Sequence, residues 1–144
     1  MRGFLLDTNV VSELIKPRPE PKVVTWVKSL DSDLTFMSVL TIGELRKGIA
    51  AHPDVGRRLK AETWLETTLK PWFEGRFLPV DMVVAERWGR LTGQVQATGG
   101  PLPVIDALLS ATALQHDLVL ATRNVRDGAR AGAEVFNPWE GGKA

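Results

Sequence analysis

The stretch Phe4-Leu5-Leu6-Asp7-Thr8-Asn9 decides the fold, because an apolar run ends abruptly in polar residues that favour the start of a helix. That helix is expected to end before Pro17. The same order of apolar run and amphipathic segment returns along the chain, with further strands expected at Leu34–Met37, Phe77–Val80, Leu118–Ala121 and Glu134–Phe136. Strands that alternate with helices predict parallel pairing, so the expected fold class is α/β: a three-layer α/β/α domain with a central, mainly parallel sheet.

The helices between these strands are marked by apolar spacing, caps and prolines. A second helix is indicated by the helical spacing of Val23, Trp26, Val27 and Leu30. Further helices are expected over Ser38–Ala51 and Val104–His116. Asp54 and Asp81 are each expected to cap a helix, the first of which continues to Pro71 and the second to a loop at Thr98. Residues 122–124 are expected to form a polar turn.

Length and composition indicate one globular domain over residues 1–144, with no linker long enough to divide it. The chain has no cysteine, which excludes a disulfide framework, a thiolate nucleophile and a cysteine-based metal site. Its 18 basic and 17 acidic residues leave a net charge of +1, whereas a general nucleic-acid binder is expected to be basic. No apolar stretch approaches the roughly 20 residues of a membrane span, so we expect a cytoplasmic protein without membrane contact.

Four oxygen-bearing side chains are placed to meet at one edge of the predicted sheet. Asp7 and Asn124 follow strands, and Glu44 and Asp106 are expected in the first turns of helices whose N-termini can face the same edge. Carboxylates packed together without basic partners repel one another, so such a cluster is stable chiefly with a hard cation among them. Mg²⁺ is the natural candidate and Mn²⁺ an alternative.

Each of these residues also has a purely structural interpretation. Asp7 can cap the helix that it precedes, and Asp106 can complement the dipole at the start of its helix. Glu44 can return to a backbone N–H in a capping box with Thr41. Asn124 can adopt the left-handed conformation of a turn residue. Only the whole set of spacings therefore favours a metal site.

The ordered set of motifs resembles that of PIN-domain proteins. The likeness covers nearly the whole chain and is closest to the VapC toxins of bacterial type II toxin–antitoxin pairs, including the FitB-like subgroup. The end of the chain, residues 135–139, also resembles the end of that subgroup. The matching stretches are Leu5-Leu6-Asp7-Thr8-Asn9-Val10-Val11-Ser12-Glu13, Ser38-Val39-Leu40-Thr41-Ile42-Gly43-Glu44-Leu45-Arg46-Lys47-Gly48, Ile105-Asp106-Ala107-Leu108-Leu109-Ser110-Ala111-Thr112-Ala113, Leu120-Ala121-Thr122-Arg123-Asn124-Val125-Arg126-Asp127 and Val135-Phe136-Asn137-Pro138-Trp139.

The resemblance implies a Mg²⁺-dependent endoribonuclease that is inhibited by a cognate VapB-like antitoxin and is usually a homodimer. Operator DNA would then be reached only through the antitoxin. Carried over by motif, Asp7 and Asp106 are the main metal ligands, and Glu44 is the third acid, by direct or water-mediated contact. The fourth position is often Asp in the family and is Asn124 here, which removes one negative charge. Asp127 is an alternative holder of that position, or a turn residue.

Neighbouring residues complete the predicted site. The residues expected to orient the carboxylates are Thr8, Asn9 and Thr122. Arg46, Lys47 and Arg123 are candidates for contact with RNA phosphates, and solvated helix faces are the alternative interpretation.

A second class of function stays open at this point. The chain could be a PIN-like subunit with weak or no nuclease activity that binds a DNA-binding antitoxin and helps to repress their operon. The likeness to the FitB-like subgroup and Asn124 keep this alternative open, whereas the presence of Asp7, Glu44 and Asp106 favours catalysis.

Overall fold

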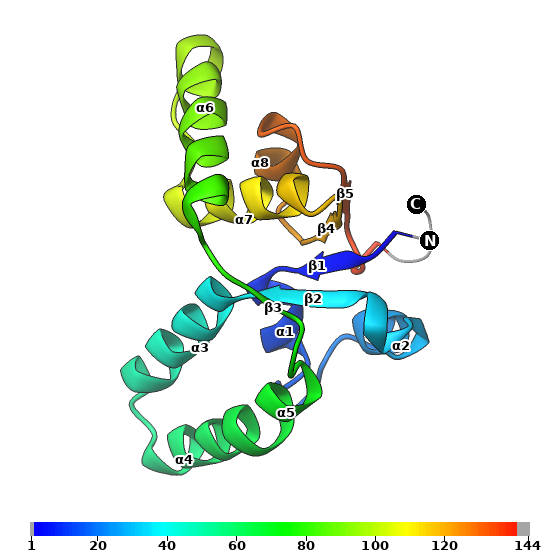
Figure 1. The fold of residues 1–144 in the computed structure, drawn as a ribbon. Coiled ribbons are helices and arrows are strands. Elements are labelled where there is room, and N and C mark those ends of the chain that lie inside the picture. The colour runs from blue at the N-terminus through cyan, green and yellow to red at the C-terminus, as the bar shows by residue number, and fades with distance from the viewer. Residues whose placement is uncertain (1, 141–144) are drawn as a thin grey trace.

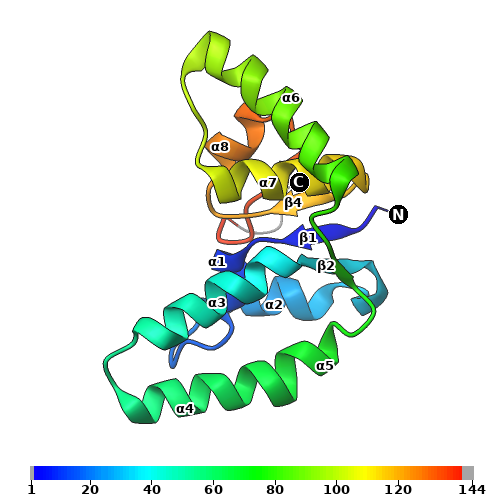
Figure 2. The ribbon, with the colours of Figure 1, turned by 60° about the vertical axis from the view of Figure 1, so that its left-hand side comes forward.

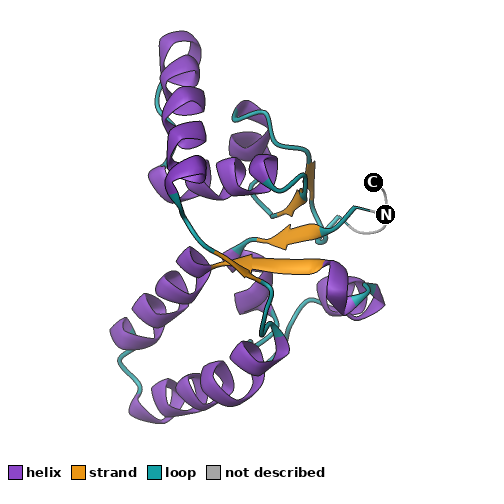
Figure 3. Ribbon diagram, viewed as in Figure 1, coloured by secondary structure: helices purple, strands orange, loops and turns teal. Residues whose placement is uncertain are grey.

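The computed structural model describes residues 2–140, which are built around parallel strands in the order β3-β2-β1-β4-β5. The strands are β1 (Phe4–Leu6), β2 (Thr35–Ser38), β3 (Phe77–Leu78), β4 (Val119–Ala121) and β5 (Val135–Phe136). The arrowheads of β1 and β2 point the same way in Figure 3, toward the side on which α3 (Val39–Ala51) begins. The predicted α/β class with a parallel sheet is confirmed.

Strand register brings two distant segments to the same edge. Leu6 at the end of β1 lies opposite Ala121 at the end of β4. The backbone N–H of Asp7 continues this ladder and donates to the Ala121 carbonyl at 2.9 Å. Asp7 and Thr122 therefore both leave the sheet at its carboxyl edge, where functional groups of α/β folds gather.

Helices cover both faces of the sheet, as Figures 1 and 2 show from two directions. One face is covered by the first five helices, and the other by the last three. The helices are α1 (Thr8–Glu13), α2 (Pro21–Ser29), α3, α4 (Val55–Trp64), α5 (Lys70–Trp72), α6 (Met82–Gly99), α7 (Val104–Gln115) and α8 (Val125–Arg130). No helix of residues 2–140 is long and apolar enough to cross a membrane.

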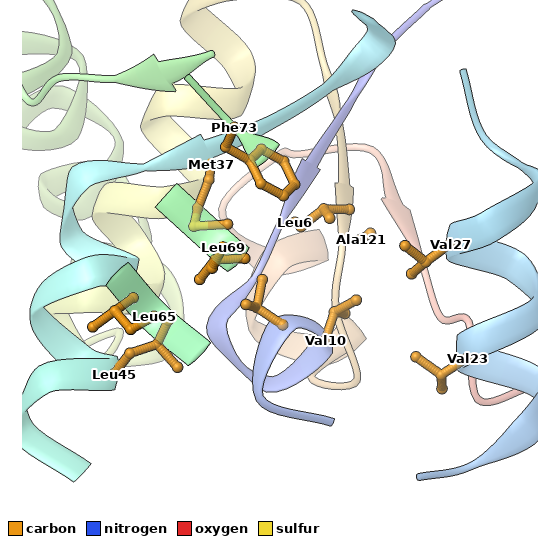
Figure 4. Packing of buried hydrophobic residues seen from close by; sticks show 11 residues of the cluster. Leu6, Val10, Val23, Val27, Met37, Leu45, Leu65, Leu69, Phe73 and Ala121 are labelled. Atoms are coloured by element: carbon orange, nitrogen blue, oxygen red, sulfur yellow. The ribbon is translucent and has the colours of Figure 1, made fainter. Parts of the chain in front are cut away.

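The core divides at β1 because successive side chains of a strand point to opposite faces. Leu6 packs with Val10, Val23 and Met37 in the larger cluster, between the sheet and the first five helices (Figure 4). Leu5 belongs to the cluster under α7 on the other face. Both leucines are fully buried. Burial of β1 on both faces explains its uninterrupted apolar sequence.

Three predicted helix starts are confirmed in detail. Ser38 caps α3 by accepting from the Leu40 N–H at 3.0 Å. Asp54 caps α4, and Asp81 caps α6 by accepting from the Val84 N–H at 3.0 Å.

The helical segment that begins after Asp54 continues to Pro71, as expected, and ends one residue later at Trp72. A proline lacks an N–H, and in an α-helix its ring meets the carbonyl four residues back. Here Leu65–Leu69 form a π-helix, η2, and the N–H of Lys70 donates to the carbonyl of Leu65, five residues back. The wider turn before Pro71 lets the chain continue as α5.

One helix boundary and one short helix also differ from expectation. Thr98 and Gly99 extend α6 through the first half of the predicted loop. The polar turn at residues 122–124 leads into α8, which the sequence patterns do not predict. This helix has only six residues, so it shows no apolar period.

Candidate active site

Asp7 lies at the junction of β1 and α1, and each of its carboxylate oxygens accepts one hydrogen bond. Its Oδ1 accepts from the Thr8 N–H at 2.6 Å, so Asp7 does cap α1. Its Oδ2 accepts from the Thr122 hydroxyl at 2.7 Å. A carboxylate oxygen has two lone pairs, so both oxygens keep acceptor capacity. The capping role and a ligand role are compatible at this residue.

Thr122 links the two segments that leave the sheet at this edge. Its side chain is buried, and its hydroxyl donates to Asp7 while accepting from the Asn124 N–H at 3.0 Å and from the Asn9 amide at 3.4 Å. One donor and two acceptor sites are all that a hydroxyl has. Thr122 therefore has one orientation, which supports its predicted role in orienting Asp7.

Glu44 reaches the same region from α3. It lies in the second turn of that helix and not in the first, as the sequence patterns suggested. The capping-box alternative is wrong, because Ser38 is the cap and Glu44 instead accepts from the Thr8 hydroxyl. Thr8 Oγ1 also lies 3.2 Å from Thr41 Oγ1. Thr8 thus ties α1 to α3 and orients Glu44, while Asn9 helps to hold Thr122.

Asp106 and Asn124 meet from the other half of the chain. Asp106 lies in the first turn of α7, as expected. The Asn124 amide donates to Asp106 Oδ2 at 3.3 Å and to Asp127 Oδ2 at 2.9 Å. The left-handed turn alternative for Asn124 is wrong, because its φ is −90° and its ψ is 70°, and it caps α8. The structure thus places Asp127 beside Asp106, with Asn124 between them.

Burial and neighbouring carboxylates raise the pKa of Asp7 and of Asp106. Burial is the main cause that raises the pKa of Asp7 from 3.8 to about 6. Hydrogen bonds from Thr122 and Thr8 oppose that rise, and the charges of Asp106 and Glu44 add to it. Burial also raises the pKa of Asp106, with the charges of Asp127 and Glu44 adding to it. Mutual repulsion of this kind is relieved by a cation.

The donor set has the chemistry of a Mg²⁺ site, namely carboxylate and amide oxygens. As the side chains stand, no set of three or more His, Asp and Glu residues within residues 2–140 is arranged to hold one ion. The hydrogen bonds of Asp7 and Glu44 nevertheless leave oxygen acceptor capacity for a ligand. The residues fit a hard cation by their chemistry and their electrostatics.

The three predicted phosphate-contacting residues lie in different surroundings. Arg46 pairs with Glu66 and lies 3.9 Å from Glu62, so it faces α4 and η2. Lys47 lines a groove of about 540 Å³ that also includes Glu44 and, from α7, Ile105.

Arg123 follows Thr122, and its guanidinium carbon lies 4.9 Å from the centre of the Trp139 ring. Of the three basic residues, Lys47 thus lies in a groove with Glu44, whereas the Arg123 guanidinium lies over Trp139 and its charge acts on Glu13.

Glu13 is a buried carboxylate near the site that the sequence patterns do not single out. It ends α1, and its oxygens accept from the Glu20 N–H at 2.8 Å and from the Lys16 ammonium at 2.8 Å. These contacts, with Lys16 first, lower its pKa despite burial, and the charge of Arg123 contributes to the same direction. The spacing of Glu13 and Lys16 was the available signal, whereas the contact with Glu20 is visible only in the fold.

Comparison with known proteins shows the family of the chain. The family model described as the PIN domain matches residues 4–131. The chain belongs to the PIN-domain family. This PIN domain is 37% identical over 136 residues to a protein named Toxin FitB from Neisseria gonorrhoeae, which spans 94% of the chain and 98% of that relative. It is 35% identical over 137 residues to a VapC ribonuclease, Y4jK, from Sinorhizobium fredii, with 95% and 98% covered.

Solved structures show the same likeness. A crystal structure described as FitAcB from Neisseria gonorrhoeae matches this PIN domain with a TM-score of 0.90 at 37% identity, covering 94% of this chain and 98% of that chain. A structure described as FitAB bound to an IR36 DNA fragment matches with a TM-score of 0.89 at 34% identity, covering 94% and 95%.

Proposed function

We propose that this PIN domain is the toxin of a type II toxin–antitoxin pair and acts as an endoribonuclease that cleaves RNA phosphodiester bonds. The observation that carries the proposal is that the charges of Asp106 and Glu44 act on buried Asp7, while Asn124 donates to Asp106. These residues come from four separate segments of a chain similar to proteins named as ribonucleases and toxins. The family likeness also implies a divalent cation, Mg²⁺ or Mn²⁺.

We assign Asp7, Asp106 and Glu44 as the residues that would hold the ion. Once bound, the ion would lower the pKa of a water and neutralise charge that develops on the phosphorus oxygens. Thr122 and Thr8 keep Asp7 and Glu44 turned toward the site through their hydroxyls. Asn124 holds Asp106 through its amide. Fixed side chains of this kind reduce the reorganisation that the reaction requires.

Asp127 supplies the charge that Asn124 lacks in this proposal. It contacts the same amide as Asp106, at 2.9 Å, and its charge raises the pKa of Asp106. Asp127 lies three residues after Asn124, in the first turn of α8. Asn124 then separates two carboxylates that would otherwise repel each other directly.

The test uses the purified full chain freed of antitoxin, incubated with structured RNA in Mg²⁺, in Mn²⁺ or in chelator. We expect cleavage only with a metal ion, and none by Asp106→Asn. Cleavage that survives both chelation and the substitution would refute the metal-dependent site. An absence of cleavage with any RNA would refute the nuclease function and favour the alternative, a subunit that acts by binding an antitoxin.

The proposed partners follow from the same relatives. A structure described as a member of the VapBC family of toxin–antitoxin systems, from Mycobacterium tuberculosis, resembles this chain at 25% identity with a TM-score of 0.67, and the FitAB structure is described as bound to a DNA fragment. We therefore propose a VapB-like antitoxin as partner and indirect contact with operator DNA. A homodimer, a single domain over residues 1–144 and a cytoplasmic location are part of the same proposal. Light scattering of the purified chain, with and without a co-expressed antitoxin, tests the assembly.

A further inference from the structure

The stretch at residues 135–139 has no role in the site described so far, although it begins with β5, which pairs with β4. Phe136 in β5 accepts a hydrogen bond from the Thr122 N–H at 2.9 Å, so the two segments are joined where the loop at residues 122–124 begins. Asn137 then turns the chain, since its side chain accepts from the Trp139 N–H at 2.9 Å. The indole packs against the larger core cluster.

This turn places the Trp139 ring under Arg123. The guanidinium carbon lies 4.9 Å from the ring centre, within the range of a cation–π contact. Arg123 is exposed, so the contact adds little to folding by burial. The position of Arg123 in the chain indicates another role, because Arg123 lies between Thr122 and Asn124, which donate to Asp7 and Asp106.

Every residue of the loop at 122–124 has a contact with α1, α7 or α8. Thr122 donates to Asp7 at 2.7 Å, and Asn124 donates to Asp106 at 3.3 Å. Between them, the Arg123 N–H donates to Asn9 Oδ1 at 3.4 Å, and its side chain lies over Trp139. A shift of Arg123 would therefore move the donors of Asp7 and Asp106 together.

We propose that Trp139 is a positioning residue: by holding the Arg123 guanidinium, its ring fixes the loop at 122–124 and with it the spacing of Asp7 and Asp106. This inference rests on the proposed ribonuclease function for its effect on the reaction. Its structural part, restraint of the loop by Trp139, stands independently. A misplacement of reacting groups by about 1 Å can lower a rate by up to about a hundredfold.

The test compares Trp139→Leu with Trp139→Phe, and uses Trp72→Leu as the matched control. Trp72 lies in α5, and its ring is 5.0 Å from that of Phe73. We expect Trp139→Leu to lower kcat on RNA about tenfold with KM changed less than about twofold, and Trp139→Phe to stay within about threefold of wild type. Trp72→Leu should leave both constants unchanged.

Hydrogen exchange gives a second measurement that does not depend on catalysis. The Asn124 N–H is held by the Thr122 hydroxyl, so we expect it to exchange about tenfold faster in Trp139→Leu and unchanged in Trp72→Leu, with amides of α6 as the check on folding. If Trp139→Leu does not fold, Arg123→Met breaks the same contact and should accelerate the same amide.

The outcomes separate the two proposals. A wild-type chain that cleaves no RNA would refute the proposed function, while the exchange experiment would still decide the restraint. Equal exchange and equal kcat in Trp139→Leu and wild type would refute the positioning role. An increase in KM with kcat unchanged would also refute it, because that result means that the pair contacts RNA directly.

Discussion

Helix α1 carries a buried carboxylate at each end, and the two have opposite electrostatic settings. Asp7, the cap, is 7% exposed, and Glu13, the last residue, is 5% exposed. The pKa of Asp7 is raised to about 6, whereas the pKa of Glu13 is lowered. Low exposure alone therefore does not set the direction: burial is the largest cause at Asp7, whereas the hydrogen bond from Lys16 outweighs burial at Glu13.

Their partners explain the difference. Glu13 has the Lys16 ammonium at 2.8 Å and a backbone N–H, so its charge is compensated. Asp7 has only a hydroxyl and a backbone N–H, and its charged neighbours are Asp106 and Glu44. A paired carboxylate is explained by the fold alone, whereas a buried carboxylate among other carboxylates costs stability and indicates a function. Four predictions test this contrast.

Asp7→Asn should have the largest effect: it should lower the activity and raise the stability of the metal-free protein. We expect RNA cleavage to fall roughly a hundredfold to a thousandfold, because the site loses one of the carboxylates that would hold the ion. Without metal at pH 7, the variant should be more stable than wild type by about 1–2 kcal/mol, because the removal of the charge outweighs the loss of one hydrogen bond, from Thr8 or Thr122, that an amide nitrogen cannot accept. Kinetics and denaturant unfolding in chelator measure the two effects.

The stability effect of Asp7 has a defined pH window. A carboxyl whose pKa is raised from 3.8 to about 6 on folding destabilises the folded state as pH rises between these values. The advantage of Asp7→Asn should thus be complete above about pH 6 and absent near pH 3. A variant less stable than wild type at pH 7 would contradict the proposed uncompensated charge.

Glu13→Gln should show the reverse pattern. The amide oxygen can still accept from the Glu20 N–H, but the pairing with Lys16 is lost, so we expect about 1–2 kcal/mol lower stability at pH 7. Because the pKa of Glu13 is lowered on folding, the difference should fade as pH falls below its ordinary value of 4.5. Cleavage by the folded variant at 25 °C should stay near wild type. A large loss of kcat would show that Glu13 also serves the site.

The sequence could predict the strands and the site at Asp7 for a local reason: an apolar run followed by a cap is visible within ten residues. Glu44 shows the limit of this reasoning. Ser38 and Thr41 are both good caps, and only the fold shows that Ser38 is used while Thr8 reaches Glu44. The partner of Glu13 is likewise a backbone group set by the path of the chain between α1 and α2. Long-range hydrogen bonds of this kind leave no periodic signal.

Substitutions that exchange the side chains at positions 124 and 127 test the role of carboxylate charge in the other half of the site. Asp127→Asn should lower cleavage about tenfold at limiting Mg²⁺, because the site loses a carboxylate next to Asp106. Asn124→Asp alone should lower the melting temperature in chelator by repulsion. The double variant Asn124→Asp/Asp127→Asn keeps the number of charges and should recover activity to within about threefold of wild type. If Asp127→Asn cleaves RNA as fast as wild type, Asp127 has only a structural role, as an acidic residue in the first turn of α8.

The smallest expected effects concern two adjacent cations on α3, Arg46 and Lys47. Arg46, like Glu13, has an ion-pair partner in the fold, and Lys47 is compared with Asp7. Arg46 is paired with Glu66, whereas Lys47 lines the groove beside Glu44. Lys47→Gln should therefore weaken RNA binding a few-fold at low salt and lower the salt dependence by about one counterion, since one phosphate contact is lost. Arg46→Gln, the matched control, should leave RNA affinity unchanged and slightly lower the melting temperature. Equal losses of affinity in both variants would contradict this prediction, because they would show that Arg46 contacts RNA despite its ion pair with Glu66.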